Sequence, residues 1–282
     1  SAIASIIANP RKKISSIVKY SGDLAWELLG LKKGVSEDEK DFWNTFSAKT
    51  VVGAERFILS RFHRVVVQNK YQKEMLKNIC EVKEGKIVQI PNGIEVYKYS
   101  EDEIRETGDE LPEGLKIATV CRLVPWKGLE FGIKAMKKIG MEGKYVIFGD
   151  GPDKHRLEEI AKEEGVRDKV IFFGKIPHKK VQLYLTNCDI LLVPSIYEPF
   201  GISILDGFAA GIPVVGSNVG GIPELLEKWQ LFESKNSNGI IDKIMYALEN
   251  KEEIIENQNM KIRDYSWSKI AKDLQREYES LI

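Results

Sequence analysis

The stretch DILLVPSIYEPFGISILDGFAAGIPVVGS, residues 189–217, decides the fold of this chain. It begins with an apolar run of strand length, continues into a segment whose apolar residues recur at helical spacing, and ends in a second apolar run. A strand, a helix and a strand in this order form the repeating unit of a parallel sheet. Residues 189–217 therefore predict two parallel strands joined by a crossover helix.

The same alternation extends towards the N-terminus. Three further apolar runs of strand length occur at KIATVC (116–121), KYVIFG (144–149) and KVIFFG (169–174), and amphipathic stretches of helix length separate them. Strands that are buried on both faces of a parallel sheet read as near-continuous apolar runs of this kind. We therefore predict a doubly wound, Rossmann-like α/β domain over residues 115–262.

Residues 1–95 follow the pattern less completely. The elements expected there are strands at 13–20, 64–68 and 86–90 and helices at 2–8 and 38–60. Three strands are few for an independent sheet, so we predict an incomplete Rossmann-like domain over 1–95. An acidic run with Pro and Gly predicts a linker over 96–114. The final helix, over 263–282, carries its apolar residues on one face, which favours packing back onto the domains.

Composition limits the function. Of the 282 residues, 43% are hydrophobic and 30% are charged, which is enough apolar sequence for packed cores and argues against a disordered chain. The 42 basic residues balance 42 acidic ones, so the chain lacks the basic excess typical of nucleic-acid binding. We expect no nucleic-acid partner, and any phosphate-binding site must be local.

Cysteine usage and hydropathy indicate a cytoplasmic protein. The three cysteines contain no Cys-x-x-Cys pair, which argues against a disulfide framework and against a zinc knuckle. No apolar run approaches the roughly 20 residues of a membrane helix. Arg11, Lys12 and Lys13 beside the apolar opening stretch are compatible with a weak peripheral membrane contact, although three solvated cations are the commoner outcome.

In an open parallel sheet, ligands bind beyond the carboxyl ends of the strands. Arg122 and Lys127 follow the strand at 116–121, where two cations match a diphosphate: Arg supplies a planar fork and Lys a point charge. A solvated charged loop is the alternative for either residue alone. Gly149, in Gly-Asp-Gly-Pro after the next strand, would let a ligand approach the backbone, although this sequence is also an ordinary tight turn.

The loop after the strand at 189–195 adds a second kind of group. Amides near Phe200, Gly201 and Ile202 begin a helix and suit phosphate or sugar oxygens. Glu198 and Asp206 would repel a diphosphate and should accept hydrogen bonds from hydroxyls. Cations for phosphate and carboxylates for hydroxyls together indicate a nucleotide sugar, whereas the helix dipole alone would explain Glu198 but not the whole set.

The three histidines add no catalytic group to this pattern. His63 opens a strand, His155 lies on a polar helix and His178 is expected in a loop, so structural or solvated roles are predicted for all three. Their spacing does not match a metal site, and the sequence has no Asp-x-Asp pair to hold a divalent ion against a diphosphate. We therefore expect no metal and no required cofactor.

Taken together, these motifs resemble the retaining glycosyltransferases of family 4, the group 1 glycosyltransferases, which have the two-domain Rossmann-like GT-B fold. The resemblance covers nearly the whole chain and is densest between Cys121 and Leu225. The segments that carry it are IPNGIE (90–95), CRLVPWKGLE (121–130), VIFGDGPDKHRLE (146–158), VIFFGKIP (170–177), VPSIYEPFGISILDGFAAGIPVVGS (193–217) and GGIPELL (220–226).

The resemblance implies transfer of a sugar from a nucleotide diphosphate, most commonly a UDP- or GDP-sugar, to a glycan or lipid hydroxyl with retention of configuration. Arg122 and Lys127 would bind the diphosphate and act catalytically with Glu198, which would face the transferred sugar. Asp206 would face the ribose hydroxyls. The remaining residues that the resemblance implies are Phe200, Gly201 and Ile202 as amide donors, Gly149 near the donor, Gly174, Lys175 and Ile176 around the nucleobase, and Gly22, Asp23 and Glu27 on the acceptor side.

Three departures from the family pattern affect these expectations. Asp206 stands where Glu is usual, which loosens or rearranges ribose binding, and Cys121 stands where Gly is usual, which narrows the space beside the phosphates. The family's amino-terminal glycine-rich loop and catalytic-site His have no match here, so about half of the acceptor domain is expected to be absent. The alternative function is therefore a nucleotide-sugar-binding module without transferase activity.

A third class, a dinucleotide-dependent oxidoreductase, would need Gly-x-Gly-x-x-Gly after a first strand, and this fingerprint is absent from the sequence. On the donor-site hypothesis, Arg122→Ala and Lys127→Ala should each weaken donor binding. Both residues are expected to be exposed in a loop, so both substitutions should leave folding near normal.

Overall fold

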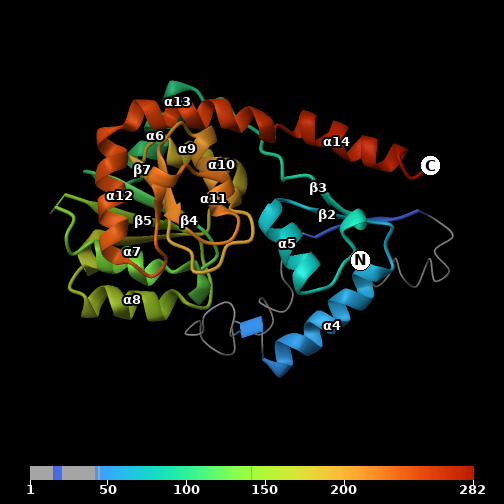
Figure 1. Ribbon diagram of the computed structural model, residues 1–282. Coiled ribbons are helices and arrows are strands. Elements are labelled where there is room, and N and C mark those ends of the chain that lie inside the picture. Colours follow the sequence, from blue (N-terminus) through green and yellow to red (C-terminus); the bar gives the residue numbers. More distant parts are fainter. Residues whose placement is uncertain (1–14, 21–41, 44, 141) are drawn as a thin grey trace. The chain divides into compact units, whose positions relative to one another are not determined.

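The computed structural model describes residues 15–20, 42–43, 45–140 and 142–282. The chain divides into two compact units (Figure 1). One comprises residues 1–93 together with 267–282, and the other comprises residues 94–266.

The larger unit contains a six-stranded parallel sheet. Its strands are β4 (Lys116–Val120), β5 (Lys144–Phe148), β6 (Val170–Gly174), β7 (Ile190–Val193), β8 (Val214–Ser217) and β9 (Leu231–Phe232). The spatial order is β6-β5-β4-β7-β8-β9, and every neighbouring pair is parallel. Numbered along this unit, that is the order 3-2-1-4-5-6 of the doubly wound dinucleotide-binding fold. The predicted doubly wound α/β architecture is confirmed.

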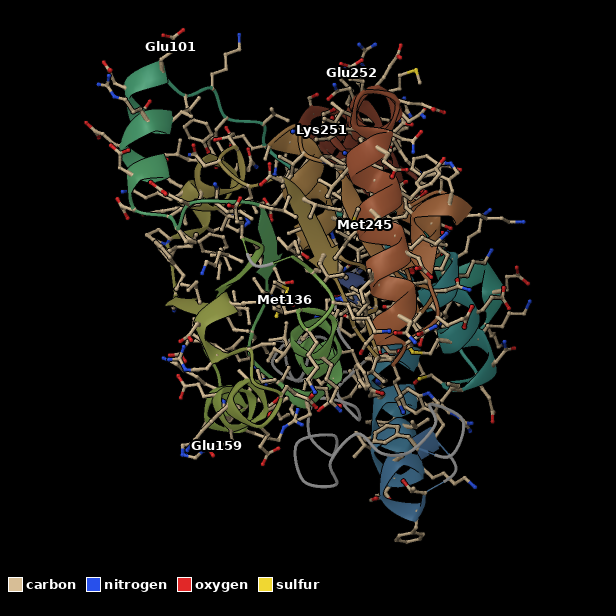
Figure 2. The ribbon with its side chains drawn as sticks, turned by 90° about the vertical axis from the view of Figure 1, so that its left-hand side faces the viewer. Glu101, Met136, Glu159, Met245, Lys251 and Glu252 are labelled. Carbon is tan, nitrogen blue, oxygen red and sulfur yellow. The ribbon has the colours of Figure 1, made fainter. Side chains whose placement is uncertain are left out.

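Helices cover both faces of this sheet. They are α6 (Glu101–Asp109), α7 (Leu129–Ala135), α8 (Lys154–Glu163), α9 (His178–Leu185), α10 (Ile202–Ala209), α11 (Ile222–Leu225), α12 (Ser237–Glu249) and α13 (Lys251–Lys261). Helix α7 packs against both α8 and α12, whereas α9 packs against both α6 and α10. Figure 2 marks several of these helices by labelled residues: Met136 just after α7, Glu159 on α8, Met245 on α12 and Glu101 at the start of α6.

Two hydrophobic cores lie on opposite faces of the six-stranded sheet, because successive side chains of a strand point to opposite sides. Along β7, Ile190 and Leu192 belong to one core, whereas Leu191 and Val193 belong to the other. The first core also takes residues from α7, α8 and α12, and the second takes residues from α9 and α10. This double burial explains why the strands are apolar at nearly every position.

The smaller unit contains a three-stranded parallel sheet. Its strands β1 (Ile17–Lys19), β2 (Arg64–Val67) and β3 (Ile87–Gln89) pair in that order. Helices α4 (Phe46–Ser60) and α5 (Lys70–Asn78) connect the strands, and α14 (Trp267–Glu279) returns to this unit. Ile270 of α14 is buried with Val66 and Ile90. Helix α14 thus extends the core of a small sheet.

Several elements differ from the sequence-based expectations. Strand β9 was not predicted, because two residues give no periodic signal. The predicted linker 96–114 contains helix α6, whose Ser100 and Glu103 form a capping box. Within the predicted helix 38–60, α4 begins at Phe46 after its N-cap Thr45, and Phe42 and Trp43 are also helical. Residues 38–41 and 44 and the predicted helix 2–8 lie outside the described residues. The domain boundaries themselves stay a prediction.

Candidate functional site

The switch point of the six-stranded sheet lies between β4 and β7. From β4 the chain winds outward through β5 and β6, and it then returns to β7 on the other side of β4. The loops that follow β4 and β7 therefore lead in opposite directions from the carboxyl ends of neighbouring strands, which is where open α/β sheets bind ligands. These loops are residues 121–128 and 194–201.

Backbone contacts hold the two loops together. The amides of Ile196 and Tyr197 donate hydrogen bonds to the Trp126 carbonyl oxygen at 2.8 and 3.2 Å. Gly128 has a φ of 64°, and a Cβ at this position would lie 2.1 Å from the Pro194 carbonyl oxygen. Glycine is required here for two reasons: the left-handed backbone conformation is unfavourable for other residues, and a Cβ atom would clash with that oxygen.

Lys127 and Glu198 meet in a largely buried ion pair. Lys127 Nζ lies 2.6 Å from Glu198 Oε2, and the two side chains are 19% and 11% exposed. Burial lowers the pKa of Lys127, but the Glu198 carboxylate outweighs this and the net pKa is raised, so the ammonium stays charged. The expectation that Lys127 is an exposed loop side chain is wrong, because the hydrogen-bonded loops place the Glu198 carboxylate directly against it.

Arg122 is exposed, as expected from the sequence. Its guanidinium carbon lies 5.9 Å from the centre of the Trp126 ring, which is within the range of a cation–π contact. Trp126 is itself buried and forms part of the short 3₁₀ turn Pro125–Lys127. The planar guanidinium is thus held over the loop that carries Lys127 while its donors remain accessible.

The start of α10 presents backbone amides beside Glu198. Gly201 precedes the helix with a φ of 95°, a left-handed conformation that favours glycine. Phe200 is buried against the Tyr265 ring, with ring centroids 6.4 Å apart, whereas Ile202 is exposed. The first amides of an α-helix have no partner within the helix, so this terminus can accept an anion or an oxygen-rich ligand.

Two glycines shape the neighbouring strand ends. Gly149, with a φ of 140°, follows β5, and a Cβ there would lie 1.8 Å from the Cys121 carbonyl oxygen. Its amide donates to the Gly174 carbonyl oxygen at 2.8 Å, which ties the end of β5 to that of β6. Gly174 has a φ of 93°, Lys175 is exposed, and Ile176 is half-buried against the second core.

Asp206 is a buried carboxylate on α10. Its Oδ1 lies 3.4 Å from Gln182 Nε2, and its Oδ2 lies 3.7 Å from His178 Nε2. Burial raises the pKa of Asp206 to about 6, and the nearby His178 and the Gln182 hydrogen bond offset part of that rise. This side chain therefore changes charge close to neutral pH.

The predicted donor-side residues lie at or after the carboxyl ends of β4, β5, β6 and β7, or on α10: Arg122, Lys127, Gly149, Gly174, Lys175, Ile176, Glu198, Phe200, Gly201, Ile202 and Asp206. The predicted acceptor-side residues Gly22, Asp23 and Glu27 lie outside the described residues. The roles of both sets stay predictions.

Two residues near Asp206 escaped the sequence analysis. His178 was expected in a loop, but it is the first residue of α9. It also lies opposite a buried carboxylate, which the expected structural or solvated role did not include. Gln182 is 1% exposed, and the only signal for it is a polar residue on the apolar face of an amphipathic segment. Neither residue could be linked to Asp206 without the fold.

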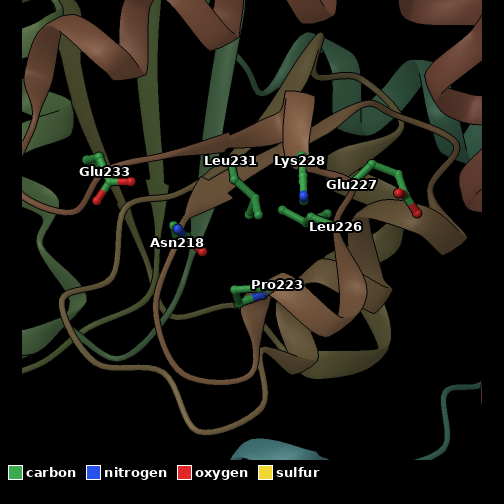
Figure 3. A pocket seen from close by; sticks show the side chains of 7 residues that line it. All are labelled: Asn218, Pro223, Leu226, Glu227, Lys228, Leu231 and Glu233. Carbon is green, nitrogen blue, oxygen red and sulfur yellow. The ribbon is translucent and has the colours of Figure 1, made fainter.

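A separate hollow lies near the ends of β8 and β9 (Figure 3). Its volume is about 520 Å³, and it is lined by Asn218, Pro223, Leu226, Glu227, Lys228, Leu231 and Glu233. None of the predicted donor-side residues is in this lining. A hydrogen bond nevertheless links the segment between the lining residues Asn218 and Pro223 to the site, because the Gly221 amide donates to the Glu198 carbonyl oxygen at 2.9 Å.

The described residues contain neither a metal-binding cluster nor a membrane-spanning helix. Among them, no group of three or more His, Cys, Asp or Glu side chains is arranged to hold a metal ion. None of the helices in this part of the chain combines the length and the apolar character needed to cross a membrane.

Comparisons with known proteins show the family of this chain. The family described as glycosyl transferases group 1 matches residues 100–267. A glycosyltransferase of Methanocaldococcus jannaschii is 33% identical over 235 residues, which are 77% of this chain and 60% of that protein. The chain therefore belongs to the group 1 glycosyltransferase family.

A more distant relative has a named activity. One subunit of the phosphatidylinositol N-acetylglucosaminyltransferase of Arabidopsis thaliana is 26% identical over 79% of this chain and 51% of its own length. The chain thus spans about half to three fifths of the length of these two relatives.

Solved structures establish the fold. HepE of Anabaena, crystallised in complex with UDP, matches 99% of this chain and 76% of its own at a TM-score of 0.83 and 19% identity. Sucrose-phosphate synthase of Thermosynechococcus elongatus matches 99% of this chain and 71% of its own at a TM-score of 0.82 and 22% identity. The predicted GT-B glycosyltransferase fold is confirmed.

Proposed function

We propose that this protein binds a nucleotide-diphosphate sugar and transfers the sugar to a hydroxyl of a glycan or lipid acceptor. The observation that carries the proposal is the Lys127–Glu198 pair at the switch point of the Rossmann-like sheet, with 2.6 Å between ammonium nitrogen and carboxylate oxygen. A nucleotide sugar joins an anionic phosphate to a hydroxyl-rich ring by one bond. The cation matches the phosphate on one side of that bond, and the carboxylate matches the sugar hydroxyls on the other.

The proposed chemistry follows from charge development. As the bond between sugar and phosphate breaks, negative charge grows on the diphosphate and positive charge grows on the sugar carbon. Arg122, Lys127 and the amides of Phe200, Gly201 and Ile202 would stabilise the leaving diphosphate. Removal of one such preorganised donor typically costs on the order of a hundredfold or more in rate. In this proposal the charge is balanced by these groups and no metal is required.

The sugar and nucleoside ends of the donor are assigned to different residues. Glu198 would accept hydrogen bonds from the transferred sugar, and Asp206 would accept them from the ribose hydroxyls. Backbone groups of Gly174, Lys175 and Ile176 would frame the base. A UDP-sugar is supported by the HepE complexes with UDP and UDP-glucose, and a GDP-sugar is the second choice.

Retention of configuration and the acceptor side are proposed from the family resemblance. Gly22, Asp23 and Glu27 would lie on the acceptor side, and a lipid acceptor has a parallel in the named activity of the plant relative. We also propose a cytoplasmic protein, with Arg11 and its neighbours making a weak peripheral membrane contact.

The donor site is tested by thermal unfolding with UDP, GDP, ADP and NAD added separately. A ligand at 100 times its dissociation constant adds about 2.7 kcal/mol of stability. We expect stabilisation by one nucleoside diphosphate and its loss in Arg122→Ala. Arg105→Ala is the matched control, because Arg105 is also exposed but lies on α6 and pairs only with Asp102 within the described residues. No shift with any nucleotide would contradict the proposal.

Transfer is tested separately from binding. Incubation with the stabilising donor and simple glycan or lipid-linked acceptors, followed by NMR of the anomeric proton, reports both turnover and stereochemistry. Addition of EDTA should leave the rate unchanged. Donor binding without transfer to any acceptor would favour the alternative function, a nucleotide-sugar-binding module.

A further inference from the structure

The two oxygens of the Asp206 carboxylate face two different side chains of α9. His178 and Gln182 stand four positions apart on this helix, so they share one face. Gln182 Nε2 lies 3.4 Å from Oδ1, and His178 Nε2 lies 3.7 Å from Oδ2. The carboxylate is thus bracketed by an amide on its buried side and an imidazole on its open side, since the His178 side chain is 64% exposed.

Gln182 is fixed at both ends of its amide. Nε2 donates to the Glu95 carbonyl oxygen at 2.7 Å, and Oε1 accepts from the Tyr97 amide at 3.2 Å. The Tyr97 amide can only donate, so it requires the oxygen of Gln182 on its side and places the nitrogen towards Asp206. The orientation of Gln182 is therefore set by backbone groups, and it can hold Asp206 Oδ1 in place.

His178 and Asp206 present two polar atoms that are close enough to contact the same hydroxyl. A distance of 3.7 Å is too long for a direct hydrogen bond between Nε2 and Oδ2. One hydroxyl oxygen about 2.8 Å from both atoms, however, could accept from an imidazole N–H and donate to the carboxylate. The pair can therefore contact a single hydroxyl that lies beside both atoms.

We propose that His178 and Gln182 complete a ribose subsite around Asp206. His178 and Oδ2 of Asp206 contact the same ribose hydroxyl, and Gln182 is a positioning residue that holds Oδ1. This inference rests on the proposed donor function and adds two residues to it. The second contact to the hydroxyl thus comes from α9, and the first from α10.

The experiment compares ribose with deoxyribose. Binding of UDP, 2′-deoxy-UDP and 3′-deoxy-UDP to the full chain is measured by calorimetry, or the corresponding series of whichever base stabilises the protein. A hydroxyl that contacts a charged group should give a preference on the order of tenfold or more over the analogue that lacks it. His178→Phe keeps a ring of similar size, and it should lose most of that preference.

Matched controls separate recognition from folding. His155→Phe changes another exposed histidine, on α8, and should keep the full preference. Gln182→Leu should lower the preference for ribose, whereas Gln258→Leu should lower only stability. Gln258 is also a buried glutamine that bridges backbone groups, with hydrogen bonds to the Val214 amide and the Ile212 carbonyl oxygen at 3.0 and 2.9 Å.

The outcomes distinguish this inference from the proposed function. If no nucleoside diphosphate binds the parent protein, the proposed function fails and the ribose subsite fails with it. If UDP binds through Arg122 but His178→Phe keeps the ribose preference, the inference alone is overturned. Equal weakening of UDP and its deoxy analogues in Gln182→Leu would assign that residue a merely structural role and would also overturn the inference. If Gln182→Leu does not fold, the ribose preference of His178→Phe still tests the inference, because His178 is exposed.

Discussion

Replacement of Asp206 by Asn should stabilise the folded protein and at the same time weaken donor binding. Burial raises the pKa of Asp206 from 3.8 to about 6. At 1.36 kcal/mol per pKa unit, this rise corresponds to about 3 kcal/mol by which the ionised carboxylate lowers the free energy of unfolding near neutral pH. Asn has no charge to desolvate, and its side-chain oxygen can still accept from Gln182.

Because the pKa of Asp206 is raised and not lowered on folding, the stabilisation by Asp206→Asn should depend on pH in a characteristic way. Because the pKa of Asp206 is higher in the folded state, its contribution to stability is fully present below the unfolded value of 3.8 and is lost as the pH rises through about 6. Urea denaturation should therefore show Asp206→Asn more stable than the parent by about 3 kcal/mol near pH 8, by about half of that near pH 5, and by almost nothing near pH 3.

A second buried aspartate provides the control. Asp153 accepts two hydrogen bonds from Arg156, at 2.7 and 2.8 Å, so Asp153→Asn should destabilise the protein at pH 8 where Asp206→Asn stabilises it. In parallel, calorimetry with UDP should show at least a tenfold loss of affinity in Asp206→Asn, since hydrogen bonds to a charged group contribute about 1.5–3 kcal/mol. A gain in stability that is independent of pH, or absent, would refute the assignment of a desolvated carboxylate.

Three further predictions concern the same strand ends. Lys127→Ala should lower the free energy of unfolding by roughly 2–3 kcal/mol in urea denaturation, because it leaves the Glu198 carboxylate buried without a cation. Arg122→Ala should change the free energy of unfolding by less than about 0.5 kcal/mol. Equal effects of the two substitutions would contradict the burial of Lys127. Gly149→Ala should cost more than about 3 kcal/mol, since its Cβ would lie 1.8 Å from a backbone oxygen, but Gly174→Ala, with open space around it, should cost only about 1–2 kcal/mol. Cys121 is half-buried, but desolvation raises the pKa of its thiol to about 12, so it should stay protonated and react only slowly with a disulfide reagent near pH 8 until urea unfolds the chain. Rapid labelling of Cys121 in the native protein, located by peptide mapping, would contradict this.

Much of the fold could be predicted because burial leaves its mark on each strand. Strands β4 to β8 all lie within the predicted apolar runs, since each of them is covered on both faces. The prediction of one helix over 38–60 missed the break at Thr45, whose side chain caps α4 by accepting a hydrogen bond from the Ala48 amide. Strand β9 was missed because only Leu231 and Phe232 pair with β8, which is too short a run for periodicity to detect.

The candidate site was predictable only as a set of loops. The sequence indicated that Arg122 and Lys127 follow one strand and Glu198 another, but it assigned the cations and the carboxylate to different parts of the ligand. The ion pair between Lys127 and Glu198 depends on β4 and β7 being neighbours, which only the strand order reveals. The contacts of His178 and Gln182 with Asp206 likewise depend on the packing of α9 against α10.

The electrostatics of the site follow from the balance of charge in the chain. With 42 basic and 42 acidic residues, the chain has no net charge to draw an anion, and at physiological ionic strength charges are screened beyond about 8 Å. Attraction must therefore come from charges close to the diphosphate. Lys127 is already paired with Glu198, whereas the structure pairs Arg122 with no carboxylate among the described residues, which makes Arg122 a charge available for the first encounter. Lys127 would then act where phosphate and sugar meet, because Glu198 holds it there.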